Sequence, residues 1–303
     1  MTVASPLPFG QYIGPELALD AAAPERLLGN VRCQVLSGGW YAMEPEWFQP
    51  RRTLANYVAF LASSGRGEIE IAERTHPFTP GRLILAPPWV PQAICQDPAE
   101  PLQFYTLHFQ ARLYGVLDMP AIFRLPQSVD LSTDVRVTVE DTLRTIVAEL
   151  AAARPGCALA ANGGCASFLA LLWRAISTSA GCVSTVGNQQ ALEVARLEPV
   201  FRVIVERHAE ALTLTDLASV LHLSAAHFST VFRAITGCSP MRYLAQYRLQ
   251  RVRELLRSTQ WSVREIAEAT GYTDPCYLSR TLRRYEGVSP IAYRRSKASP
   301  AFP

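Results

Sequence analysis

The chain has 303 residues, 49% of them hydrophobic, and a formal net charge of +3. This length predicts about two domains with enough apolar side chains for two cores. Seven cysteines without a C-x-x-C pair or a zinc-ligand spacing exclude a zinc finger and a disulfide framework, and they are typical of reduced thiols in the cytoplasm. The N-terminus lacks a signal-peptide pattern, and no uncharged apolar run approaches the length of a membrane span. We therefore expect a soluble cytoplasmic protein without a membrane partner.

The basic residues are unevenly distributed along the chain. From Leu192 onward there are 16 Lys and Arg against 10 Asp and Glu, whereas the rest of the chain has 13 against 16. A basic C-terminal part joined to a mildly acidic N-terminal part fits a chain that binds a polyanion with its C-terminal part only. Nucleic acid is such a partner. On charge alone, a solvated basic face explains the same pattern.

Residues 1–30 form a leader that is rich in Pro and Ala. Residues 31–125 contain short runs of β-forming residues separated by Gly- and Pro-containing turns, which predicts an antiparallel sandwich or small barrel. We predict strands in VRCQVL (31–36), LANYVAFLA (54–62), EIEIA (68–72), RLILAP (82–87), QAIC (92–95) and FYTLHFQ (104–110).

Residues 126–180 have a helical period. Val137–Ala153 carries apolar residues on one face, and a more apolar helix follows at about Ala160–Thr178. These two helices either cover the barrel or pack against the same helices of a second copy, and the second arrangement would make the protein a homodimer. Residues 181–191 are small and polar, as in a linker.

Residues 192–295 are predicted to be entirely helical, and 296–303 form a tail. The first helix is predicted at Glu193–His208, and a long helix at Met241–Ser258. The stretch Ser262–Tyr293 has the pattern of a helix-turn-helix, with Gly271 at the turn between two amphipathic helices. The apolar face of the second helix is predicted to consist of Tyr277, Leu278, Leu282 and Tyr285.

This pattern occurs twice. Ala218, Phe228, Phe232, Gly237, Pro240 and Tyr243 stand where the later copy has Ala267, Leu278, Leu282, Gly287, Pro290 and Tyr293. The spacing of 49 residues before the turn and 50 after it is that of a structural repeat with one inserted residue. Two unrelated helix pairs are the alternative, but G-x-S-P-x-x-Y recurs in full after both second helices.

The C-terminal part resembles the DNA-binding domain of the AraC/XylS family of bacterial transcription regulators. The resemblance is carried by Y-R-L-x-R-x-x-x-L-L in the long helix, I-A-x-x-x-G-Y at the second turn and the closing G-x-S-P-x-x-Y. The N-terminal part resembles the cupin-like sensor of that family through G-x-G at 65–67, the run from Thr79 to Pro88 and Tyr105–Phe109. The resemblance implies an α+β chain of a cupin-like barrel, two helices and a double helix-turn-helix domain.

The sensor departs from the family pattern at Arg82 and Gln92, where an acidic residue and a His are usual. His76 and His108 stand alone, without the H-x-H of metal-binding cupins, so we expect no metal, no cofactor and no catalytic residues. A lone His in a strand is more often a core or rim residue than a ligand. Aromatic or polar residues that either line an effector pocket or pack in the core are Trp40, Tyr57, Trp89, Tyr105 and His108.

In the second unit, Arg280 is the best candidate for contact with a base, because Arg bonds guanine O6 and N7 bidentately. Pro275, Cys276 and Ser279 are expected to face the groove, and Arg283 and Arg284 to contact phosphates. In the first unit the family's base-contacting positions fall on shorter side chains, with two flanking residues: Ala226, His227, Ser229, Thr230 and Arg233. A surface salt bridge is the alternative role for Arg280.

These features predict a sequence-specific transcription regulator, acting as an activator, that contacts double-stranded DNA and RNA polymerase. The barrel would bind a small-molecule effector, dimerise, or do both. One alternative is a ligand-independent regulator whose barrel only dimerises. The other is a cupin enzyme or alkyl-transfer protein fused to a DNA-binding domain, which the lone histidines and unpaired cysteines disfavour.

Overall fold

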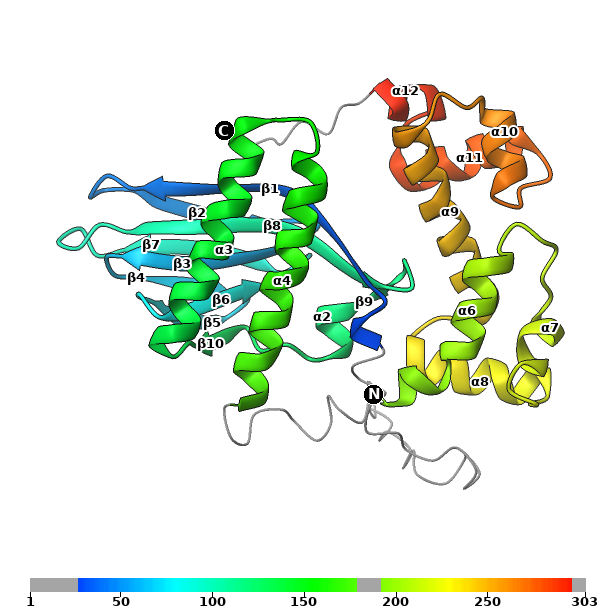
Figure 1. Ribbon diagram of the computed structural model, residues 1–303, viewed down its shortest axis with the longest axis horizontal. Helices are drawn as coiled ribbons and strands as arrows, with labels where there is room; N and C mark the ends of the chain where they lie inside the picture. The colour runs from blue at the N-terminus through cyan, green and yellow to red at the C-terminus, as the bar shows by residue number, and fades with distance from the viewer. Residues whose placement is uncertain (1–26, 179–191, 296–303) are drawn as a thin grey trace.

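The computed structural model describes residues 27–178 and 192–295. The predicted leader lies outside the described residues except for its last four, and the predicted linker and tail lie outside them almost entirely. Within the described ranges, an N-terminal β domain with helices on one face precedes an all-helical domain (Figure 1).

Two antiparallel sheets form the N-terminal domain. One has the strand order β1-β8-β3-β6-β10, with β9 paired to β8, and the other has the order β2-β7-β4-β5. The strands are β1 (Val31–Ala42), β2 (Phe48–Thr53), β3 (Tyr57–Ser64), β4 (Gly67–Ile71), β5 (Arg74–Phe78), β6 (Arg82–Ala86), β7 (Pro91–Gln96), β8 (Gln103–Leu113), β9 (Leu117–Asp118) and β10 (Ser128–Asp130).

The larger sheet is buried on both faces. Phe60, Ile84 and Phe104 point toward the smaller sheet and form a core between the two. On the opposite face, Leu107 and Phe109 pack under the helices α3 (Thr133–Ala152) and α4 (Cys157–Thr178), with the short α2 (Met119–Ile122) beside them. The central strand β3 is therefore continuously buried from Tyr57 to Ala62 rather than alternating. The predicted fold class, an antiparallel cupin-like β domain followed by helices and an all-helical domain, is confirmed.

The helices α3 and α4 cover the larger sheet, as one of the two predicted arrangements requires. Val139, Leu143 and Ile146 face the sheet from α3, and Phe168 and Leu172 do so from α4. By length and composition alone, α4 is apolar enough to cross a membrane, but these contacts make it part of the core of the β domain. The arrangement with a second copy stays a prediction.

The second domain contains α6 (Glu198–Arg207), α7 (Leu214–Ser219), α8 (Ala225–Thr236), α9 (Pro240–Ser258), α10 (Val263–Ala269), α11 (Pro275–Glu286) and α12 (Pro290–Arg295). The single helix predicted at Glu193–His208 is wrong in one respect, because the helix is interrupted at Leu197 before α6 begins. Pro199, in the first turn of α6, has no N–H to continue a helix from the preceding turn.

The first half of the helical domain shares one core with the β domain. Tyr114, in the turn between β8 and β9, stacks on Phe201 of α6 with ring centroids 4.8 Å apart. The Tyr243 hydroxyl of α9 donates to the Tyr114 carbonyl over 3.3 Å, and both groups are buried. Phe228 and Phe232 of α8 belong to the same continuous core. The second half has a separate core around α10 and α11.

Candidate nucleic-acid interface

The second helix-turn-helix unit is α10 and α11, and its ends are fixed by side-chain caps. Ser262 and Glu265 form a capping box at α10, with the Glu265 carboxylate 2.7 Å from the Ser262 N–H and 2.7 Å from its hydroxyl. These hydrogen bonds lower the pKa of Glu265. At α11 the Asp274 carboxylate accepts from the N–H groups of Cys276 and Tyr277 at 2.8 and 3.1 Å, and Pro275 occupies the first turn.

The turn of this unit lies against the segment that follows α6. Gly271 adopts φ +76°, and a Cβ placed there would lie 2.8 Å from the carbonyl oxygen of His208 and 2.9 Å from that of Ala209. Only a residue without a side chain permits this approach of two backbones. Because Leu278 and Leu282 are buried beneath α11, the opposite side of that helix faces outward.

Most of the residues predicted to contact DNA from α11 lie on its outward side. Arg280 has a side chain that is 75% exposed, and its guanidinium stands 3.8 Å from the Asp274 carboxylate. Cys276, Arg283 and Arg284 are also exposed. Pro275 and Ser279 are half-buried, and the Ser279 hydroxyl donates to the Pro275 carbonyl at 2.9 Å.

Two tyrosines on α11 differ from the sequence interpretation. Helical spacing assigned Tyr277 and Tyr285 to the apolar face, but each is 56% exposed. Leu278 and Leu282 alone fill the narrow contact with α10, so the tyrosine rings remain beside the arginines. Their amphipathic rings add two side chains to the candidate interface that the periodicity concealed.

The first unit, α7 and α8, has the same construction. Thr213 and Asp216 form its capping box, and α8 ends at Gly237 with φ +78°, as α11 ends at Gly287 with φ +75°. Of the residues predicted to face DNA, those that are exposed are Ala226, Thr230 and Arg233, and those that are half-buried are His227 and Ser229. The Thr230 hydroxyl donates to the Ala226 carbonyl at 3.1 Å.

The long helix α9 holds the two units in a fixed relation. Arg248 donates through Nε to the His208 carbonyl and through a terminal nitrogen to the Glu210 carbonyl, both at 2.7 Å. Nearer its end, Arg253 donates through Nε to Glu286 of α11 at 2.8 Å. Both arginines are thus committed to contacts within the domain. Burial lowers the pKa of Arg248.

A groove runs along α11, between the second unit, α9 and the segment that follows α6. It has a volume of about 950 Å³ and is lined from α11 by Tyr277, Arg280 and Arg284 and from α9 by Gln246. A groove with two guanidinium groups and a tyrosine ring suits a phosphate backbone, because arginine forms bidentate hydrogen bonds with phosphate oxygens.

The predicted effector residues do not form one pocket. Trp40 is 45% exposed and Trp89 is 73% exposed. Tyr57 and Tyr105 face the helices, where the Tyr57 hydroxyl donates to Asp118 at 2.9 Å and that of Tyr105 lies 3.4 Å from Nε of Arg144. His108 lies on the opposite face of β8, 3.1 Å from the Asn56 amide. Their role as effector ligands stays a prediction.

Two ionisable groups among these residues are strongly affected by burial. Burial and, to a smaller extent, the charge of Arg52 lower the pKa of His108 to about 4, so its imidazole is neutral at neutral pH. Burial raises the pKa of Tyr57 well above its usual value, and the neighbouring Asp118 carboxylate adds to this effect.

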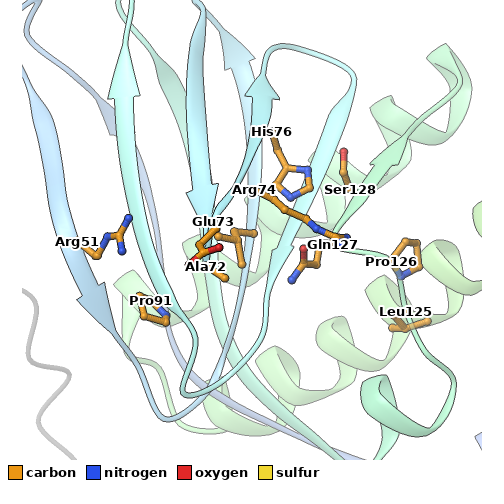
Figure 2. A pocket seen from close by; sticks show the side chains of 11 residues that line it. Arg51, Ala72, Glu73, Arg74, His76, Pro91, Leu125, Pro126, Gln127 and Ser128 are labelled. Atoms are coloured by element: carbon orange, nitrogen blue, oxygen red, sulfur yellow. The ribbon is translucent and has the colours of Figure 1, made fainter.

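A cavity of about 840 Å³ opens where the edges of the two sheets separate (Figure 2). Arg74 and His76 approach it from β5, and Gln127 and Ser128 face them from the segment leading into β10. This cavity contains His76, one of the lone histidines, but none of the predicted effector residues. Within residues 27–178 and 192–295, no three His, Cys, Asp or Glu side chains are grouped so that they could hold a metal ion.

Comparisons with known proteins agree with this architecture. Residues 39–181 match the family model described as an AraC-like ligand binding domain, and residues 217–296 match a helix-turn-helix domain model. The Msm operon regulatory protein of Streptococcus mutans is 23% identical over 79% of this chain and 84% of its own length. The raffinose operon transcriptional regulatory protein of Pediococcus pentosaceus is 34% identical, over 30% of this chain and 33% of its own.

Two solved structures show the extent of the likeness. The DNA-binding domain of AdpA in complex with a target DNA is 31% identical over 33% of this chain and 90% of its own, with a TM-score of 0.32. ToxT from Vibrio cholerae, with a bound unsaturated fatty acid, is 11% identical over 87% of this chain and 94% of its own, with a TM-score of 0.40.

Alignments with relatives such as the raffinose operon regulator and the MmsAB operon regulatory protein of Pseudomonas aeruginosa span about a third or less of the length of those proteins. The sensor and helix-turn-helix models, by contrast, account for most of the described chain in the order in which the fold presents them. The chain belongs to the AraC/XylS family.

Proposed function

We propose that this protein is a sequence-specific, DNA-binding transcription regulator. The observation that carries the proposal is the pair of identically capped helix-turn-helix units joined through α9, with Arg280, Arg283 and Arg284 exposed along α11. Exposed guanidinium groups beside a helix that fits a major groove supply both phosphate contacts and base contacts. Double-stranded DNA is the partner that this chemistry suits.

The two units would dock in successive major grooves on one face of the DNA. The hydrogen bonds of Arg248 and Arg253 oppose independent movement of the units, so the spacing of their sites should be fixed at about ten base pairs, or ~34 Å. Three exposed arginines lie on α11, whereas α8 presents Ala226 and Thr230 with a single exposed arginine, Arg233. We therefore expect α11 to supply most direct base contacts, and α8 to depend on methyl contacts, water and DNA shape.

Selection of binding sites from random double-stranded DNA by the full chain tests this function. The expected result is one enriched site with two short conserved blocks about ten base pairs apart. The double variant Arg280→Ala/Arg284→Ala should lose conservation in one block only. The same variant also tests whether the groove along α11 contributes to DNA binding, because both arginines line this groove. No enrichment of any sequence by the folded wild-type chain would contradict the proposal.

The finer role of the N-terminal domain is part of the same proposal. The β domain would bind a small-molecule effector or form a homodimer, and the regulator would act in the cytoplasm, as an activator that contacts RNA polymerase. Direct packing of the β8–β9 turn on α6 gives an effector in the β domain a physical route to the first unit. Exposed Leu159 at the start of α4 supports an interface with a second copy.

Effector binding and dimerisation can be separated by experiment. Thermal-shift screening of the full chain with metabolites should identify a stabilising compound, because a ligand that binds only the folded state raises the melting temperature. That compound should then change DNA affinity. Sedimentation of the same chain measures its oligomeric state, and a stable dimer that responds to no compound would favour the ligand-independent regulator.

We further propose that the protein is not an enzyme. The lone positions of His76 and His108 support this, since they lie on different strands and contact different parts of the β domain. Metal analysis and an alkyl-transfer assay are direct tests. Stoichiometric metal, or transfer of an alkyl group to a cysteine, would favour the fused-enzyme alternative.

A further inference from the structure

Two cysteines meet where β1 crosses beneath α4. The Val35 N–H, at an irregularity in the pairing of β1 with β8, donates to Oδ1 of Asn162 on α4 at 2.8 Å. Cys33 is two residues before Val35 on the strand and Cys165 is three residues after Asn162 on the helix. Each cysteine therefore lies on the same face of its element as the residue in this contact. Cys165 belongs to the core between α4 and the larger sheet, and Cys33 packs against this same core.

The two thiols differ in access to solvent. Cys165 is completely buried in the core between α4 and the larger sheet. Cys33 is half-buried and lines a groove of about 840 Å³ between the β domain and α9. Asn162 lines the same groove, so the groove reaches the point where the strand and the helix meet. A small solute can therefore reach Cys33 but not Cys165.

The pKa values of the two thiols also differ, and the thiol that solvent can reach has the lowered one. The hydrogen bond from Cys165 lowers the pKa of Cys33, and this interaction together with burial raises the pKa of Cys165. A thiolate is the form of cysteine that reacts with oxidants. The accessible member of the pair is thus also the more reactive one, and the buried member is a protonated thiol held beside it.

We propose that Cys33 and Cys165 form a redox modification site that a hydroperoxide converts to a disulfide. The Cys33 sulfur attacks the distal peroxide oxygen, the O–O bond breaks, and Cys33 becomes a sulfenic acid while water or an alcohol leaves. The Cys165 sulfur then attacks the Cys33 sulfur, the S–O bond breaks, and a second molecule of water leaves with the thiol proton. The two thiols supply the two electrons that reduce the peroxide.

The position of this bond gives it a structural consequence. Cys33 is paired with Ala111 on β8, three residues before the Tyr114 turn that packs on Phe201. A disulfide would join α4 covalently to the strand pair that leads into this turn. Because a crosslink between distant residues restricts the unfolded chain, the oxidised protein should melt at a higher temperature.

The test uses the reduced full chain treated with hydrogen peroxide at a few molar equivalents, followed by peptide mapping without reductant. The expected product is a peptide pair joined through Cys33 and Cys165, which dithiothreitol separates again. Cys165→Ala should stop at a sulfenic acid on Cys33 that dimedone traps, and Cys33→Ser should leave Cys165 as a free thiol. The rise in melting temperature on oxidation should disappear in both variants.

Cys95→Ser is the matched control, because Cys95 is exposed on β7, away from α4. This variant should form the Cys33–Cys165 bond as readily as the wild type. Cys157 serves as an internal comparison, since it is the first residue of the same helix. A disulfide from Cys33 to any other cysteine, or a Cys33 that stays reduced while Cys95 is oxidised, would overturn the proposal. The outcome is independent of DNA binding.

Discussion

Arg280 extends from the exposed side of α11, and its guanidinium lies 3.8 Å from the Asp274 carboxylate. An exposed ion pair at this distance contributes little to stability, so the guanidinium is free to exchange it for a base or a phosphate. Arg280→Ala should weaken binding to the selected DNA by about 1–3 kcal/mol, or roughly 5- to 150-fold, with relaxed specificity at one position.

Titration of the wild-type chain and the Arg280→Ala variant against DNA substituted at each position measures this effect. Arg264→Ala is the matched control, because Arg264 is also an exposed arginine of the second unit but pairs with Glu268 on α10 at 3.1 Å. It should leave the pattern of base preference unchanged. A loss for Arg280→Ala that is equal at every substituted base would restrict Arg280 to phosphate contact.

His108 should make the stability of the β domain depend on pH. Its pKa is lowered from 6.5 to about 4 in the folded chain, so the unfolded chain binds more protons between these values. The group therefore costs no stability at neutral pH, and the folded state loses stability as the pH falls below about 6.5, by roughly 2 kcal/mol at pH 5. Urea unfolding at pH 7 and pH 5 measures the change.

His108→Gln is the informative variant, since an amide keeps an uncharged partner for Asn56, which lies 3.1 Å from the imidazole. It should unfold with a smaller difference between pH 7 and pH 5. The lowered pKa of His208 acts in the same direction and remains in both proteins, so only the difference between them reports on His108. An identical pH dependence would contradict the buried, neutral state of His108.

At the scale of elements, Gly271 brings the turn of the second unit onto the segment that follows α6. Gly271→Ala forces φ +76° on a residue with a Cβ and places that atom against two carbonyl oxygens. Gly287→Ala imposes φ +75° in the same way, but a Cβ there meets nothing within 4 Å. Both variants should lose about 1 kcal/mol from the left-handed conformation, and Gly271→Ala roughly 1–3 kcal/mol more from crowding.

Urea unfolding of the two variants at neutral pH gives this comparison, and DNA titration gives its consequence. Gly271→Ala should also weaken DNA binding, because the shifted turn changes the relation of α11 to α8. Gly287→Ala should retain the spacing of the two units. Equal losses of stability in the two variants would show that the backbone contact with His208 and Ala209 is not tight in solution.

The elements that the sequence predicted best are those that repeat. Two copies of one pattern specified both helix-turn-helix units and the helix between them. The strands β2, β5, β9 and β10 were missed, because edge strands such as β5, with a buried residue only at Phe78, lack clear alternation. The exposed positions of Tyr277 and Tyr285 were missed because helical spacing alone does not measure the width of a buried face.

At the scale of the whole molecule, the packing between domains depends on a contact that no local pattern marks. Tyr114 lies in a turn of the β domain, and its ring stacks on Phe201 of a helix far along the chain. Neither residue belongs to a motif, and the linker between them suggested independent domains. The shared core instead joins the β domain to the first unit, while the second unit has its own core around Leu278.

This division predicts how the full chain unfolds. Tyr114→Ala removes a ring stacked at 4.8 Å in the shared core and should cost about 3 kcal/mol, as for other large-to-small core substitutions. The lost contact lies between the two domains, so calorimetry of this variant should show two separated unfolding transitions, whereas the wild-type domains unfold with stronger coupling.

Tyr243→Phe removes only the hydrogen bond to the Tyr114 carbonyl. It should cost about 1 kcal/mol of stability and should also weaken the coupling between the domains. Phe48→Ala is the control, because Phe48 is a large but mostly exposed residue on β2, and it should leave the coupling intact. If Tyr114→Ala and Phe48→Ala gave the same calorimetric profile, the β8–β9 turn would not transmit changes in the sensor to the first helix-turn-helix unit.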